Sequence, residues 1–222
     1  MPQTMFVAAL ISLLLCGTAT ASPDQAHIAA ILQCPSVVCV QTFRCDVPLE
    51  IWNRALDHID IMGRLWSLYG FQPAYRTTPT GEGGLHIVDP SGIVGELRPI
   101  ARSDHARTYY GEGTFDHWAI PAVFSAAGVA VLDYRADGRG VSGEMRLHLR
   151  GSNRISRFAM GLVSGPLVRH IGRRFRSNLE DTEKILRAIA HDPDTVRQGL
   201  DAPAREAFDQ AFPPAGSAEP PR

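Results

Sequence analysis

The sequence has almost no net charge, because its 22 Lys and Arg residues are balanced by 23 Asp and Glu residues. Proteins that bind nucleic acid through electrostatics carry a marked basic surface, and this balance gives no sign of one. No basic stretch is long enough to predict permanent attachment to anionic lipid. We therefore expect no nucleic-acid partner.

Motifs for metals and dinucleotides are also missing. The eight histidines are scattered, and no His-x-His or His-Glu-x-x-His spacing supplies two ligands from one element. The pairs Asp104-His105 and Asp116-His117 come nearest to a metal or acid/base signature, but adjacent strand residues point to opposite faces. Gly111 and Gly113 lack the third glycine and the helix of a dinucleotide-binding loop. We expect neither a metal nor a cofactor.

The first segment, residues 1–21, contains no charged side chain. Its apolar run from Phe6 to Leu15 is too short to span a bilayer stably. Small residues follow, with Ala19 and Ala21 at the positions that a signal peptidase recognises. The pattern predicts a secretory signal cleaved before Ser22, and therefore a periplasmic or secreted protein. A retained membrane anchor is the alternative, and Leu15 before Cys16 disfavours lipidation.

Three cysteines follow the expected cleavage point, namely Cys34, Cys39 and Cys45. Their spacing does not match a zinc knuckle, and no second pair of ligands lies nearby. A disulfide between Cys34 and Cys39, closing a small loop, is one structural use in an oxidising compartment. Free buried thiols are the other, and the spacing leaves both open.

The mature chain is long enough for one core, and its pattern is that of a single α+β domain. We expect an amino-terminal segment at residues 22–36, the domain at residues 37–191, a helical extension at residues 192–212 and a disordered tail at residues 213–222. Inside the domain, a strand at 37–44 leads into one or two short helices between 48 and 69. Short extended runs follow at 85–88, 93–100, 107–115, 122–134 and 141–149.

The connections between these runs are short and rich in Gly, Pro and Asp, which favours antiparallel neighbours. In the run 141–149, apolar Val141, Met145, Leu147 and Leu149 alternate with polar residues, as in a strand with one face in water. Helical spacing returns at 155–163 and continues from Leu167 to Ile189. A helix of that length would be about 35 Å long, enough to cross a whole sheet.

Two segments carry a resemblance to a known family. Residues 43–52 (FRCDVPLEIW) and 173–186 (RRFRSNLEDTEKIL) resemble the strand-to-helix junction and the final helix of the START-like superfamily. This superfamily, also called SRPBCC or helix-grip proteins, includes polyketide cyclases, lipid-transfer domains and birch-pollen-type allergens. The resemblance covers residues 37–191. It implies a curved antiparallel sheet wrapped around a long carboxy-terminal helix, with two short helices after the first strand.

The resemblance also implies a cavity between the sheet and the long helix, lined by apolar side chains. The alternative for each candidate is an ordinary place in the core. The candidate lining residues are Trp52, Trp66, Tyr69, Tyr110, Phe115, Trp118, Phe124, Phe158 and Leu162.

Three functions follow from such a cavity. The first, which we favour, is an exported protein that binds and carries a hydrophobic small molecule or lipid. The second is a polyketide cyclase or aromatase, in which His117, Tyr110 or Asp133 would orient and protonate a substrate. The third is an interaction protein whose own side chains fill the cavity. The cluster of Arg169, Arg173, Arg174 and Arg176 is either a solvated helix face or a site of transient membrane contact.

Overall fold

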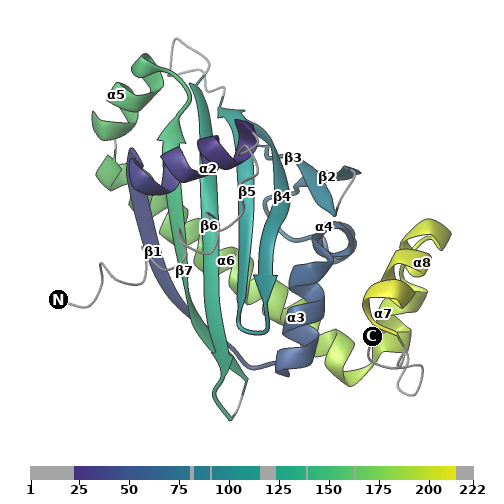
Figure 1. Ribbon diagram of the computed structural model, residues 1–222. Coiled ribbons are helices and arrows are strands. Elements are labelled where there is room, and N and C mark those ends of the chain that lie inside the picture. Colours follow the sequence, from purple (N-terminus) through teal and green to yellow (C-terminus); the bar gives the residue numbers. More distant parts are fainter. Residues whose placement is uncertain are drawn as a thin grey trace.

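A computed structural model describes residues 23–80, 83–90, 92–115, 124–138, 140–162 and 164–213. One seven-stranded antiparallel sheet, in the order β1-β7-β6-β5-β4-β3-β2, curves around a long helix, α6 (Figure 1). Helix α2 covers the opposite face, so the sheet has an inner face toward α6 and an outer face toward α2. Among the described residues, no helix is both long enough and apolar enough to cross a membrane. The elements are α2 (Pro23–Gln33), β1 (Val37–Cys45), α3 (Leu49–Asp57), α4 (Ile59–Leu68), β2 (Arg76–Thr80), β3 (Gly84–Val88), β4 (Ile93–Ser103), β5 (Ala106–Phe115), β6 (Phe124–Ala136), β7 (Val141–Gly151), α5 (Arg154–Leu162), α6 (Ser164–His191), α7 (Pro193–Gln198) and α8 (Ala202–Ala211).

The expected α+β helix-grip architecture is confirmed. The strand expected at 37–44 is β1, and the two short helices after it are α3 and α4. Strand β7 has the expected alternation, with Val141 fully buried and Met145 nearly so on the inner face. The long helix is α6, which begins before Pro166 because proline is tolerated in the first turn.

One expectation was wrong. No extended run was expected before residue 85, because TPTGEGG at 78–84 has the composition of a turn, yet β2 extends through Thr80 and pairs with β3. Proline is accepted at Pro79 because β2 is the edge strand of the sheet, where a missing N–H costs no ladder bond. The turn is therefore shorter than its composition indicates.

The principal core lies between the inner face, the carboxy-terminal half of α6 and the helices α3, α4, α7 and α8. On α6, Ile185, Leu186 and Ile189 are almost completely buried. Phe208 of α8 is among the most deeply buried side chains in the described structure. The helical extension at 192–212 thus packs into the core of the domain and helps to stabilise it.

A smaller cluster lies on the outer face, under α2. Ile31 of α2 is fully buried against Val129, Ala127 and Tyr110 of the sheet. The helix is also held by Arg150, whose guanidinium donates a hydrogen bond of 2.6 Å to the carbonyl of Ala30. Burial of this apolar patch fixes α2 across the outer surface of β6 and β7 (Figure 1).

Candidate functional site

Of the three predicted tryptophans, the two that the structure describes, Trp52 and Trp66, lie in the packed part of the interior. The Trp52 ring stacks on Phe43 with a centroid distance of 5.3 Å, and its edge meets Tyr134. Trp66 contacts Phe71 and Tyr75 on the other side of the core. The Trp52 indole N–H is buried without a hydrogen-bond partner among the described residues. A buried indole N–H usually has an acceptor, so an oxygen from water or from a bound molecule would stabilise this position.

The other predicted lining residues do not gather around one space. Tyr110 lies on the outer face under α2, because strand alternation turns Tyr109 inward and Tyr110 outward. Tyr69 lies at the surface, stacked on Phe71. Phe158 and Leu162 are each 71% exposed on α5. The backbones of Phe115 and Phe124 pair in neighbouring strands, while their side chains and the whole of Trp118 lie outside the described residues.

The interior has two unlike halves along α6. The carboxy-terminal half is packed, as Ile185 and Leu186 show by their complete burial. The amino-terminal half is looser, and its apolar residues Leu167, Val168 and Ile171 are only half-buried. The half-buried Leu149 lies on the inner face at the same end of the sheet. Apolar side chains near this end of the sheet therefore remain partly exposed to solvent.

Small residues cross the inner face at the same end. Gly151, Ala126, Gly113 and Gly95 are directly paired across β7, β6, β5 and β4. A Cβ on Gly95 would lie 2.6 Å from the Glu112 carbonyl oxygen, which is too close for any side chain. Only glycine therefore fits at Gly95, and this row of the inner face carries no large side chain. We call these four residues the small-residue row.

An ion pair joins α6 to the far side of the sheet. Arg174 contacts the carboxylate of Asp89, after β3, at 3.2 Å, and Asp89 is only 6% exposed. The Arg174 guanidinium also lies 5.9 Å from the Tyr75 ring, and the Tyr75 hydroxyl is within hydrogen-bond distance of Asn178. Arg174 therefore links helix and sheet, whereas Arg169, Arg173 and Arg176 are exposed.

The two residues nominated for catalysis that the structure describes are not on the inner face. Asp133 faces outward and pairs with Arg146 at the surface. Tyr110 also faces outward, and its hydroxyl donates to the Glu112 carboxylate at 2.7 Å. His117 lies outside the described residues. Tyr134 does face inward, but burial raises the pKa of its hydroxyl to about 12, which makes it a poor proton donor near neutral pH.

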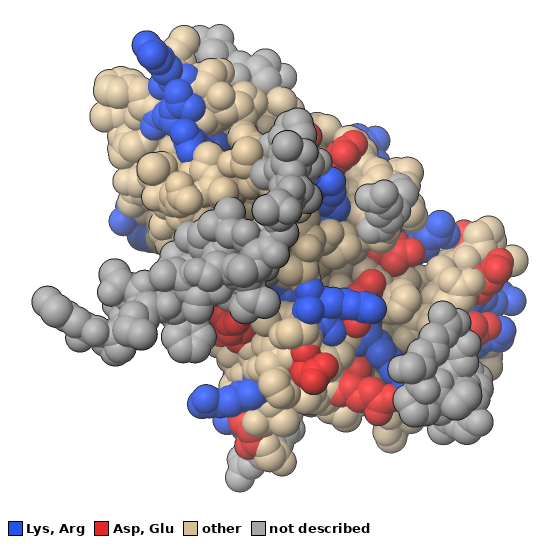
Figure 2. Space-filling model, viewed as in Figure 1, with Lys and Arg blue, Asp and Glu red and all other residues tan. Residues whose placement is uncertain are grey.

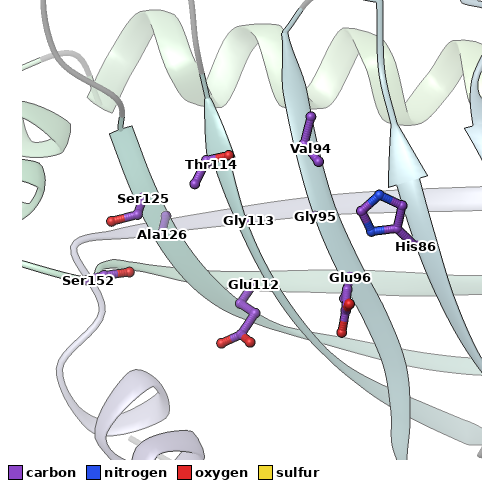
Figure 3. A pocket seen from close by; sticks show the side chains of 10 residues that line it. All are labelled: His86, Val94, Gly95, Glu96, Glu112, Gly113, Thr114, Ser125, Ala126 and Ser152. Carbon is purple, nitrogen blue, oxygen red and sulfur yellow. The ribbon is translucent and has the colours of Figure 1, made fainter. Parts of the chain in front are cut away.

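A separate pocket of about 370 Å³ lies on the outer face across β3 to β6 (Figure 3). His86, Glu96 and Glu112 are cross-strand neighbours along one side of it, and Thr114 and Ser125 lie along the other. The pocket is open to solvent and lies on the face of the sheet opposite α6, so it is distinct from the cavity that the resemblance implies. No group of three or more His, Cys, Asp or Glu residues in the described part of the chain is arranged to hold a metal ion.

The three cysteines are free thiols. Cys34 is exposed at the end of α2, while Cys39 and Cys45 are buried on β1. Burial, reinforced by the nearby Glu183 carboxylate, raises the pKa of the Cys45 thiol to about 12. Of the two uses that the spacing leaves open, the structure has the free thiols and not the Cys34–Cys39 bridge.

Comparison with known proteins supports the architecture alone. No family model matches the chain, and no curated protein matches it. Among solved structures, a conserved protein from Geobacillus kaustophilus has a TM-score of 0.50 at 8% identity, covering 69% of this chain and 97% of that one. Uncharacterized proteins from Rhizobium leguminosarum and Mesorhizobium loti each have a TM-score of 0.42, at 14% and 18% identity. They cover 68% and 67% of this chain and 94% and 96% of their own lengths. The likeness to the Geobacillus kaustophilus protein concerns the fold alone, a curved antiparallel sheet with a long carboxy-terminal helix, which is compatible with the helix-grip fold.

Proposed function

We propose that this protein is an exported member of the START-like superfamily that binds a hydrophobic small molecule or lipid and carries it through an aqueous compartment. The binding region is the space between the amino-terminal half of α6 and the small-residue row. The two sequence segments that resemble the superfamily fall on the β1 to α3 junction and on residues 173–186 of α6, where they contribute to the packed core.

The observation that carries the proposal is the contrast between the two halves of the interior. A protein that only needs stability gains by burying all the apolar side chains of its longest helix. Here Leu167, Val168 and Ile171 stay half-buried, at the end of the sheet that carries the small-residue row. A bound apolar molecule would complete their burial, and no catalytic group is needed for that gain.

The cyclase alternative is less well supported. Asp133 and Tyr110 face away from α6, so neither can act on a molecule held against the inner face. The third alternative, a core filled by its own side chains, applies to the carboxy-terminal half of α6 but does not explain the half-buried residues of the other half.

Two neighbouring alanines provide a matched test. Ala126 is half-buried on the inner face, in the small-residue row, whereas Ala127 is 3% exposed on the outer face under α2. We expect Ala126→Leu to reduce uptake of a fluorescent fatty acid several-fold with little change in stability. Ala127→Leu should instead overpack the smaller cluster at a cost of about 1 to 3 kcal/mol and leave uptake per folded molecule unchanged.

The proposal fails if the parent protein takes up no fatty acid and Ala126→Leu is as destabilising as Ala127→Leu. Mass spectrometry of a solvent extract of the protein from its own host would identify the natural ligand. Amino-terminal sequencing of the same material tests export, since Ser22 should be the first residue. An intact Met1 would contradict the soluble carrier.

A further inference from the structure

Helix α5 presents an apolar face that the described structure leaves uncovered. Ile155, Phe158 and Leu162 are 74%, 71% and 71% exposed, and their spacing of three and four residues places them on one side of the helix. The opposite side is anchored to the domain, because Ser156 and Met160 are buried. Helix α5 is therefore a fixed element with its apolar face outward.

The residues of α5 and of the adjoining first half of α6 include several arginines and no acidic residue. No Asp or Glu occurs between Glu144 and Glu180, although the whole protein is almost neutral. Arg154 and Arg157 lie on α5 itself, and Arg169 and Arg173 are exposed on the adjoining first half of α6. Among the described residues, none of these four arginines forms an ion pair.

Figure 2 shows the same asymmetry on one face of the molecule. In the upper left region, which carries α5 in Figure 1, blue side chains stand among neutral atoms, and the red side chains lie elsewhere on this face. An amphipathic helix with bulky apolar residues on one face and arginines beside it has the composition of helices that lie in the interface of an anionic bilayer.

We propose that α5 docks this protein on the surface of an anionic phospholipid membrane. Ile155, Phe158 and Leu162 enter the boundary between headgroups and acyl chains, while the surrounding arginines pair with lipid phosphates. Together these residues form the docking face. This proposal does not depend on ligand binding, but it gives the proposed carrier a way to meet its cargo, because α5 packs beside the amino-terminal half of α6.

A membrane is the occupant best matched to this surface. A second copy of the chain would bring the same uncompensated arginines together, which like charges oppose. An anionic bilayer offers both the charge and the apolar depth. Its attraction should weaken with salt, because Arg154, Arg169 and Arg173 are exposed and Arg157 is half-buried, and charges in water are screened at physiological ionic strength.

The experiment measures binding of the protein, expressed from its full sequence and purified after export, to vesicles of phosphatidylcholine with or without phosphatidylglycerol. We expect binding to the anionic vesicles that falls steeply as salt is raised. The triple variant Ile155→Ser, Phe158→Ser, Leu162→Ser should bind at least tenfold more weakly. The matched control Val38→Ser, Val40→Ser removes two exposed valines from β1 and should bind like the parent.

Two double variants test the role of charge, and a tryptophan variant tests whether α5 enters the bilayer. Arg154→Gln with Arg157→Gln should weaken binding and flatten its salt dependence, whereas Arg102→Gln with Arg135→Gln makes the same charge change at other exposed sites and should have no effect. Phe158→Trp should give a blue-shifted emission on anionic vesicles that brominated lipid quenches.

Three outcomes would overturn the proposal: no binding of the parent to anionic vesicles, equal loss in the triple variant and the valine control, or a parent dimer that the triple variant dissolves. The last result would identify the docking face as an interface between copies. Uptake of fluorescent fatty acid from solution is measured separately, and the triple variant should retain it. If the parent takes up no fatty acid, the carrier function is rejected. If the parent takes up fatty acid but does not bind anionic vesicles, membrane docking alone is rejected.

Discussion

The unequal halves of α6 predict unequal costs for the same substitution. Leu186 is fully buried, and truncation of such a residue to alanine removes transfer free energy and leaves a cavity, at a cost of about 3 to 5 kcal/mol. Leu167 is only half-buried, so Leu167→Ala should cost about 1 kcal/mol. Leucine and alanine are both strong helix formers, and helix propensity therefore contributes little to the difference.

Urea unfolding followed by circular dichroism measures this difference. With an m-value of about 2 kcal/mol/M, the midpoints of the two variants should differ by about 1 to 2 M. The midpoint of Leu167→Ala should lie about 0.5 M below that of the parent, and the slopes should be the same. Equal losses in the two variants would mean that the amino-terminal half of α6 is packed as tightly as the other half. That result would refute the physical basis of the proposed binding region.

Three further predictions concern groups away from this region. Arg107 is 6% exposed and pairs with Asp57 at 2.6 Å, so Arg107→Met should lower the free energy of unfolding in urea by about 3 to 5 kcal/mol. Arg187 pairs with Asp46 at the surface, so Arg187→Met should lower it by less than about 1 kcal/mol. Equal losses in the two variants would contradict this prediction. Burial, with a smaller effect of Arg146, lowers the pKa of His148 below its usual 6.5, so the unfolded chain binds the proton first and stability should fall as pH drops below about 6.5. His148→Gln should lessen that fall, and an unchanged pH profile would exclude His148 as a cause. In the folded protein, a maleimide should label Cys34 quickly and Cys39 and Cys45 only after unfolding; no labelling of Cys34 without reductant would indicate the disulfide.

The sequence predicts the sheet well where side chains alternate or turns are short. Strand β7 could be assigned residue by residue because its inner positions are apolar and its outer positions polar. The long helix could be predicted because apolar residues keep helical spacing from Leu167 to Ile189. Strand β2 was missed because its Thr and Pro residues have the composition of a turn, and only its pairing with β3 holds it extended.

The candidate site was harder to predict because an aromatic residue does not show which face it occupies. Tyr109 and Tyr110 are adjacent and both buried, yet one packs toward α6 and the other under α2. The sequence did not predict α2, so a second buried face was not considered. The better signal was the small residues Gly95, Gly113 and Ala126, which become a row only through the strand register.

The two halves of α6 contribute unequally to the stability of the fold. The carboxy-terminal half of α6 is secured by α3, α4, α7 and α8, and burial there supplies most of the apolar stabilisation that the described structure shows. The amino-terminal half contributes less, so local opening near α5 would cost far less than global unfolding. A carrier needs this distribution, because its cargo must enter and leave while the domain stays folded. The docking face lies on α5, beside the half of α6 that can open at the smallest cost, and contact with a membrane at this face would bring the binding region to its source of lipid.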